Sequence, residues 1–306
     1  MFVGHGLLAF AIVALAGERL GWDRAVVVPA AVLAGLFGTL PDVDVVYGLV
    51  GLVEQPSGTV EAFWAAGNRV HRGLTHALPV GLVTAGAVGL LAGRDAWSLA
   101  GGAVLVGVVA LATVVWGGLG GLVATAFVAG ASALARAGRR RGLTPRAVAG
   151  AALVGLLTHP FGDLFTGSPP AMLYPLDAVV VADRIELAAD PTLHLLAAFG
   201  VELAAVGVAF VAACRVTDRR AVDQVRRRAA LGVVYGGAAF VLPAPTLAVS
   251  YQFVYSVLAV GVVGAAPAGW PTVPSLPRTD VWRAVGTALA TVAVAAGAYA
   301  VVYVLV

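Results

Sequence analysis

The chain alternates between long apolar runs and short polar segments. The runs are rich in Ala, Val, Leu and Gly, and most charged residues fall between them. Several runs approach the roughly 20 apolar residues that an α-helix needs to cross the hydrocarbon core of a bilayer. The pattern predicts an all-α, polytopic transmembrane helical bundle of about eight to ten spanning helices, over approximately residues 2–17, 26–41, 77–92, 97–115, 119–135, 147–162, 193–214, 229–249, 251–266 and 284–306.

Two of these runs need separate comment. Pro243 and Pro245 interrupt the region 242–268, where they either kink one helix or divide two. The first run lacks a basic leading region and His5 interrupts its start, so it does not read as a secretory signal.

Composition supports the membrane interpretation. The chain is 60% hydrophobic and 11% charged, with a mean hydropathy of +0.94, whereas soluble domains carry about 25% charged residues. An ordinary soluble fold and a disordered chain are therefore excluded. Cys214 is the single cysteine, so no intramolecular disulfide forms. The net charge of +3 is too small to indicate a nucleic-acid partner.

Arginine placement predicts the topology. The chain has no lysine, and its arginines are densest in segments 136–146 and 215–228. Two apolar runs lie between these segments, so both lie on one side of the membrane, which the positive-inside rule makes cytoplasmic. Counting spans from there, we expect fourteen arginines before residue 229 on the inner side and three on the outer side, namely Arg69, Arg72 and Arg184.

The histidines fall on the other side. Each lies at the predicted outer end of a run, together with several aspartates, although this feature did not enter the topology argument. We therefore expect one polar cluster at the extracytoplasmic face, drawn from His5, Asp42, Asp44, His71, His76, His159, Asp163, Asp190 and His194.

The residue types and spacings in this set are typical of a metal site. Asp163 follows His159 by four residues, which places both side chains on one helix face. Imidazole nitrogen combined with carboxylate oxygen suits zinc, with manganese or iron as further possibilities. Because more ligands are present than one ion requires, we expect one or two ions. The predicted ligands are His5, Asp44, His71, His76, His159, Asp163 and His194.

The same residues suggest catalytic roles. A metal-activated water would be the nucleophile, and Asp42 or Asp44 would act as general base or bridging ligand. Arg72, beside His71, is placed to hold a phosphate or carboxylate oxygen.

Each residue also has a structural interpretation. Asp42 follows Pro41 as a turn residue would, and His159 and Asp163 can form a buried hydrogen-bonded pair. Asp190 before Pro191 is typical of an N-cap with proline at the first helical position. In that case His194 becomes an ordinary residue of the first turn.

Four motifs together resemble the YdjM family of inner-membrane proteins, which are described as metal-dependent hydrolases and also labelled LexA-binding. They are Gly4-His5-Gly6-Leu7-Leu8, Leu40-Pro41-Asp42-Val43-Asp44, His71-Arg72-Gly73-Leu74-Thr75-His76 and His159-Pro160-Phe161-Gly162-Asp163-Leu164-Phe165-Thr166. The third is the most specific, and Tyr174-Pro175-Leu176 also fits the family pattern. The resemblance covers roughly residues 1–200.

More remotely, the layout is similar to zinc-dependent phospholipase C and the S1/P1 nucleases. That similarity implies His5, Asp42 or Asp44, His71 or His76, His159 and Asp163 as ligands. The chain departs from the phospholipase pattern because no Glu lies four residues after His194, which argues against a third metal. It also has an additional apolar pair around 97–135 and an extension past residue 215.

We therefore expect a hydrolase-like membrane domain over 1–215 and a transmembrane extension over 216–306. The expected activity is metal-assisted hydrolysis of a phosphoester or other ester in a lipid or lipid-linked substrate, at the outer face of the inner membrane. The alternatives are a zinc transporter and a metal-binding membrane protein without catalysis. No nucleic-acid partner is expected, and the sequence identifies no protein partner.

Overall fold

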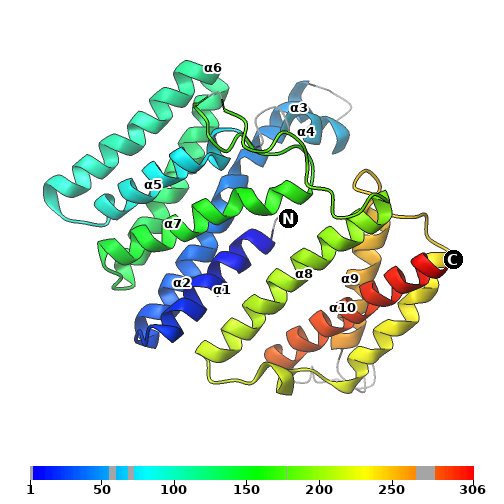
Figure 1. Cartoon of the computed structure of the whole chain (residues 1–306). Helices are drawn as coiled ribbons and strands as arrows, with labels where there is room; N and C mark the ends of the chain where they lie inside the picture. Colours follow the sequence, from blue (N-terminus) through cyan, green and yellow to red (C-terminus); the bar gives the residue numbers. More distant parts are fainter. Residues whose placement is uncertain (1–2, 55–59, 68–71, 177, 267–279) are drawn as a thin grey trace. The chain divides into compact units, whose positions relative to one another are not determined.

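A computed structural model describes residues 3–54, 60–67, 72–176, 178–266 and 280–306 (Figure 1). Every regular element within these ranges is helical, which confirms the all-α prediction. The chain forms two compact units, residues 1–184 and 185–306. The expected division at residue 215 concerns the extent of a hydrolase domain and stays a prediction.

The first unit is built from apolar helices joined by short turns. The α2 helix begins at the N-cap Asp23, whose carboxylate accepts a hydrogen bond from the Ala25 N–H, and α7 begins at Thr144 with Pro145 in its first turn. The elements are α1 (Gly4–Arg19), α2 (Arg24–Thr39), the 3₁₀ segment η1 (Leu40–Tyr47), α3 (Gly48–Glu54), α4 (Val60–Gly67), η2 (Leu74–His76), α5 (Leu78–Leu91), α6 (Asp95–Arg140), α7 (Pro145–Gly162) and η3 (Asp163–Phe165).

The α6 segment is a helical hairpin. Gly117 has φ 71° and ψ −169°, which breaks the helix between the two predicted runs. A Cβ at Gly121 would collide with the Thr113 side chain, and one at Gly120 would lie 2.5 Å from the Trp116 Cβ. Residues eight apart in a straight helix lie more than two turns apart, so this contact requires the chain to reverse. Two separate runs at 97–115 and 119–135 are thus confirmed.

Small residues allow the helices of this unit to pack closely. A Cβ at Gly155 of α7 would lie 2.5 Å from the Ala34 carbonyl oxygen and 2.6 Å from the Phe37 Cβ, both on α2. A Cβ at Gly6 of α1 would lie 2.7 Å from the Gly35 carbonyl oxygen. Such contacts are typical of membrane bundles, where dispersion forces rather than the hydrophobic effect hold helices together.

Polar residues lie at opposite ends of these helices. The turn between α1 and α2 contains Arg19 and Arg24, whereas His5 begins α1 and Asp42 follows α2. In the same way α7 runs from Arg146, in its first turn, to its histidine and aspartate at the other end. The first unit therefore separates its arginine-rich end from its histidine end, as the sequence predicts.

The second unit contains α8 (Pro191–Val216), η4 (Ala221–Gln224), η5 (Arg227–Phe240), α9 (Tyr251–Ala265) and α10 (Val281–Leu305). Its core includes Phe253, Val257 and Tyr299. Residues 241–250 contain Pro243 and Pro245 and form no regular helix, so the prolines divide two helical segments rather than kink one. The run predicted over 229–249 therefore ends as a helix at Phe240.

Five helical stretches in the described chain are long and apolar enough to cross a membrane: Arg24–Glu54, Asp95–Arg140, Pro145–Phe165, Pro191–Val216 and Val281–Leu305. Leu78–Leu91 and Tyr251–Ala265 are shorter apolar helices. The α6 stretch holds two runs joined at Gly117. The total of eight to ten spans stays a prediction.

Candidate metal centre

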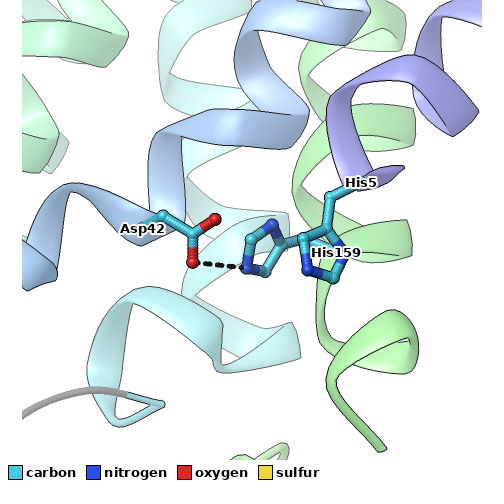
Figure 2. A group of neighbouring side chains, drawn as sticks. All are labelled: His5, Asp42 and His159. Atoms are coloured by element: carbon cyan, nitrogen blue, oxygen red, sulfur yellow. Dashed lines mark ion pairs between the residues drawn. The ribbon is translucent and has the colours of Figure 1, made fainter. Parts of the chain in front are cut away.

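Four segments distant in sequence meet at the histidine end of the first unit. His5 lies in the first turn of α1, Asp42 lies in η1 and His76 ends η2. His159 lies in the last turn of α7, and Asp163 follows as the first residue of η3. Figure 2 shows His5, Asp42 and His159 directed toward one another from three separate helical segments. The cluster is thus a product of tertiary packing.

The ligand-type atoms of this cluster lie close together. The His76 Nε2 lies 3.3 Å from the Asp163 Oδ2 and 3.7 Å from the Asp42 Oδ1. The His159 Nε2 lies 3.5 Å from the Asp42 Oδ1, the pair joined by the dashed line in Figure 2, and 3.8 Å from the Asp163 Oδ2. Two groups, each with atoms within 4.8 Å of one another, are suited to hold a metal: His5, Asp42 and His159, and His76, His159 and Asp163.

His5 packs into the side of this cluster. Its ring centroid lies 4.1 Å from that of His159, and its Nε2 lies 3.4 Å from the Asp163 Oδ1. The ring fits because residue 162 is glycine, where a Cβ would lie 2.5 Å from the His5 Nδ1. Glycine in the His-Pro-Phe-Gly-Asp motif therefore provides the space for a histidine from the other end of the unit's sequence.

The cluster is buried, and several of its polar atoms have no hydrogen-bond partner among the described residues. His159 is 0% exposed and Asp163 is 2% exposed. The His5 and His159 Nε2 atoms and the Asp42 and Asp163 Oδ2 atoms make no hydrogen bond in this part of the chain. Buried polar atoms normally find a partner. A cation that accepts their lone pairs would satisfy these atoms, so the donor set fits a metal.

The far sides of two imidazole rings are held by other groups. The His159 Nδ1 lies 2.7 Å from the Gly38 carbonyl oxygen, which can only accept, so the ring donates there and its Nε2 carries a lone pair. The His76 Nδ1 lies 3.0 Å from the Thr75 hydroxyl and 3.3 Å from the Asp44 Oδ2. Metal-binding histidines are typically oriented by such a bond to a carbonyl or carboxylate.

Asp44 and Asp42 contact opposite nitrogens of the same ring. The Asp44 Oδ2 accepts hydrogen bonds from the Thr75 hydroxyl at 2.9 Å and from the Arg72 N–H at 3.3 Å. Asp44 is 0% exposed, whereas the Asp42 side chain is 14% exposed. Asp44 therefore supports His76 from behind, while Asp42 faces the ring's Nε2. The predicted role of Asp44 as a metal ligand stays a prediction.

Arg72 ties the end of α7 to the following segment. Its Nη1 donates to the Ser168 carbonyl at 2.6 Å and to the Asp163 carbonyl at 3.4 Å. Its Nη2 donates to the Asp163 Oδ1 at 3.2 Å and to the Thr166 hydroxyl at 3.3 Å. Both terminal nitrogens thus have protein acceptors, whereas the buried Nε has no hydrogen-bond partner among the described residues. The predicted clamp role stays a prediction.

The electrostatics of the cluster are set by its carboxylates. Burial would lower the pKa of His76, but hydrogen bonds to Asp163, Asp42 and Asp44, with the charge of Asp44, outweigh it and raise this pKa to about 10. Without a metal, His76 is therefore positively charged at neutral pH. The positive charge of His76 then neutralises part of the negative charge of the surrounding carboxylates, as a bound divalent cation would.

The described cluster does not test two of the predicted ligands. His71 lies outside the described residues. His194 belongs to the second unit, where its Nδ1 accepts a hydrogen bond from the Leu187 N–H at 3.0 Å, and it joins neither candidate metal group found in the described chain. Asp190 is the N-cap of α8 and accepts bonds from the Thr192 and Leu193 N–H groups, which confirms the structural interpretation. A ligand role for His194 stays a prediction.

Sequence reasoning missed three supporting groups. Thr75 lies inside the most specific motif, so its position was a signal, and Thr166 ends another motif. No feature of the sequence identifies the Gly38 carbonyl, because every residue has a backbone oxygen and only tertiary packing determines which one contacts His159.

The fold and the site define a helical membrane protein with a buried histidine–aspartate cluster at one end of its first unit. The sequence model of the YdjM inner membrane protein family matches residues 1–243. The chain therefore belongs to the YdjM family of inner-membrane proteins. No curated protein and no solved structure matches it, and the remoter similarity to phospholipase C and the nucleases is not shown.

Proposed function

We propose that this protein is a membrane-embedded, metal-dependent hydrolase of the inner membrane. The observation that carries the proposal is the convergence of two imidazole nitrogens and a carboxylate oxygen, all buried, at the end of α7. His76, His159 and Asp163 are the proposed ligands. A histidine pair with one carboxylate, leaving a fourth position open, is a ligand set used by catalytic zinc.

The spacing of these atoms fits a small ion. Ligands about 2.0–2.1 Å from a tetrahedral zinc lie about 3.3–3.4 Å from one another. The Asp163 Oδ2 lies 3.3 Å from the His76 Nε2 and 3.8 Å from the His159 Nε2. Small side-chain movements would bring the Asp163 Oδ2 and the His159 Nε2 to this spacing. Manganese or iron would suit the same donors.

The geometry favours one ion over two. Both candidate groups include His159, and its Nε2 has a single lone pair, so it can bind one ion only. His5 then lies beside the ligands rather than at a second ion, with its Nε2 3.4 Å from the Asp163 Oδ1.

Asp42 is the proposed general base. Its side chain is the most exposed of the cluster, and its Oδ1 lies 3.5 Å and 3.7 Å from the Nε2 atoms of His159 and His76. A carboxylate there can accept a proton from a water on the open side of the site. A bound divalent ion would acidify that water and polarise the ester oxygen. Asp44 and Arg72 hold His76 and Asp163 in place.

The location supports a lipid or lipid-linked ester as substrate. The α2 helix ends at Thr39 and α7 ends at Gly162, and the cluster lies beside both helix ends. The candidate span that contains α7 ends at Phe165, whereas the one that contains α2 continues to Glu54. Arginine placement favours the extracytoplasmic side for this end. A transporter site is expected near the middle of the bilayer, so a cluster at helix ends favours hydrolysis.

The test combines metal analysis with turnover. Purified protein is expected to contain about one zinc, manganese or iron ion per chain and to hydrolyse bis(p-nitrophenyl) phosphate or a fluorogenic phospholipid. His159→Ala should abolish both metal and turnover, whereas His194→Ala should keep both. A metal-free protein whose turnover is unchanged by His159→Ala would overturn the proposal. Zinc uptake by proteoliposomes without turnover would indicate the transporter instead.

A further inference from the structure

The segment after the metal centre has a fixed base. The Ala171 N–H donates to the Arg72 carbonyl at 2.9 Å, and the Leu78 N–H donates to the Met172 carbonyl at 2.8 Å. The Tyr174 ring lies 4.8 Å from that of Trp116, at the tip of the α6 hairpin. These contacts, with the Arg72 guanidinium, hold the base of the segment to the end of the unit that carries the metal centre.

Beyond this base the segment presents apolar side chains outward. Leu176 is 64% exposed, Val179 is 79% exposed and Val180 is 57% exposed. Residues 178–182 read Ala-Val-Val-Val-Ala, without a polar side chain. They form no regular helix, so no helical face accounts for the exposure. Exposed apolar groups gathered in this way mark a surface that another apolar phase covers.

The position of the segment identifies that phase. The candidate span Pro145–Phe165 ends eleven residues before Leu176, and the base contacts return the chain to that same end. The base of the segment is therefore held at the height of this span end, where the bilayer interface is expected. At that height lipid is the apolar phase available to every copy of the protein.

We propose that residues 178–182 insert into the lipid interface beside the metal centre, and that the centre receives its ester from the bilayer there. Insertion is supported by the exposed side chains, the base contacts and the end of the candidate span Pro145–Phe165. The second half rests on the proposed hydrolase function.

Insertion is tested by site-directed spin labelling in vesicles of phosphatidylethanolamine and phosphatidylglycerol. Cys214 is fully buried and is replaced by alanine; single labels are then placed by Val179→Cys and Val180→Cys. Val106→Cys, on the exposed side of α6, provides the lipid reference, and Asp223→Cys provides the water reference. Spin labels at positions 179 and 180 should collide more often with oxygen, which partitions into lipid, than with a water-soluble nickel chelate. The label at position 106 should show the same preference. A water-like result at both positions would overturn insertion.

The access half is tested with two substrates. Val179→Asp should reduce turnover of a vesicle-borne fluorogenic phospholipid while leaving that of bis(p-nitrophenyl) phosphate and the metal content unchanged. Val222→Asp, at another exposed valine, is the matched control and should change neither. Equal loss on both substrates would overturn the access role. Absence of turnover in the unmodified protein would instead refute the hydrolase function, and the labelling result would still decide insertion.

Discussion

The chain contains two histidine–aspartate pairs with the same four-residue spacing, and they behave differently. His159 and Asp163 both enter the buried cluster at the end of α7. Asp190 instead accepts from a backbone N–H in the first turn of α8, and His194 accepts from the Leu187 N–H in the segment before that helix. Spacing alone therefore does not distinguish a pair that enters the cluster from one that bonds to backbone groups.

The difference follows from which helix end carries the pair. The first turn of a helix has N–H groups without intrahelical partners, and a carboxylate there accepts their hydrogen bonds. Asp190 does this for Thr192 and Leu193, and the Tyr303 hydroxyl also lies 3.3 Å from its Oδ2. Asp163 instead follows the last turn of α7, where the unpaired backbone groups are carbonyl oxygens that cannot donate to a carboxylate, and it faces the cluster.

The variant with the largest expected effect tests the difference between the two pairs directly. His159→Ala removes the nitrogen shared by both candidate metal groups, and should lower metal affinity by more than the roughly 10–100-fold that loss of a supporting partner costs. His194→Ala should leave the affinity unchanged. Both are measured by elemental analysis of purified protein and by titration with a metal indicator.

These two variants also decide the assignment of the pairs. Equal metal loss in both would place His194 in the same centre and contradict the distinction between the pairs. Loss in neither would show that the buried cluster binds no metal.

The second prediction concerns Asp44, which contacts the His76 ring in the cluster that contains the first pair. Asp44→Asn keeps an oxygen for the Thr75 hydroxyl but removes the charge beside the His76 Nδ1. Metal affinity should fall by roughly 10–100-fold, the range for loss of an outer partner. Asp190→Asn is the matched control and should not change it. A larger loss, equal to that of His159→Ala, would mean that Asp44 is itself a ligand.

The third prediction tests the packing that brings the first pair to its place. Gly155→Ala puts a methyl group 2.5 Å from the Ala34 carbonyl oxygen, and overpacking of this kind costs about 1–3 kcal/mol of unfolding free energy. Gly150→Ala on the same helix meets nothing within 4 Å and should be neutral or stabilising. Unfolding in mixed micelles measures both. Equal stability of the two variants would contradict the close contact of α2 with α7.

The smallest effect belongs to the second pair. Asp190→Ala removes the N-cap of α8 and should lower the unfolding free energy by about 0.5–2 kcal/mol, with metal content unchanged. Asp190→Ser should restore most of that loss, since a serine hydroxyl can cap as well. A change in metal content would show that the pair does more than cap its helix.

Much of the fold was predictable because the position and length of each apolar run determine where a helix forms. The α7 and α8 helices begin within two residues of the predicted runs 147–162 and 193–214. Glycine and proline marked the breaks at Gly117 and around Pro243. Part of the cluster was predictable because polar residues are rare in such a chain, and the structure brings together His5, Asp42, His76, His159 and Asp163 from the predicted set.

The roles within the cluster were not predictable from spacing. Asp42 and Asp44 looked interchangeable, yet η1 is a 3₁₀ segment with three residues per turn, so residues two apart point to different sides. One carboxylate meets each nitrogen of His76 as a result. Arg72 looked open to an anion, but its acceptors come from Asp163, Thr166 and Ser168, more than ninety residues away, which no local pattern reveals.

The wide spacing of the cluster along the chain constrains how the protein is made. His5 and Asp42 are synthesised more than a hundred residues before His159. During insertion, the first two helices must keep these polar ends hydrated until α7 arrives and packs against both. The cluster is therefore completed late in biogenesis. Under the proposed function, a ribosome-bound chain that stops before residue 159 should be unable to retain an ion.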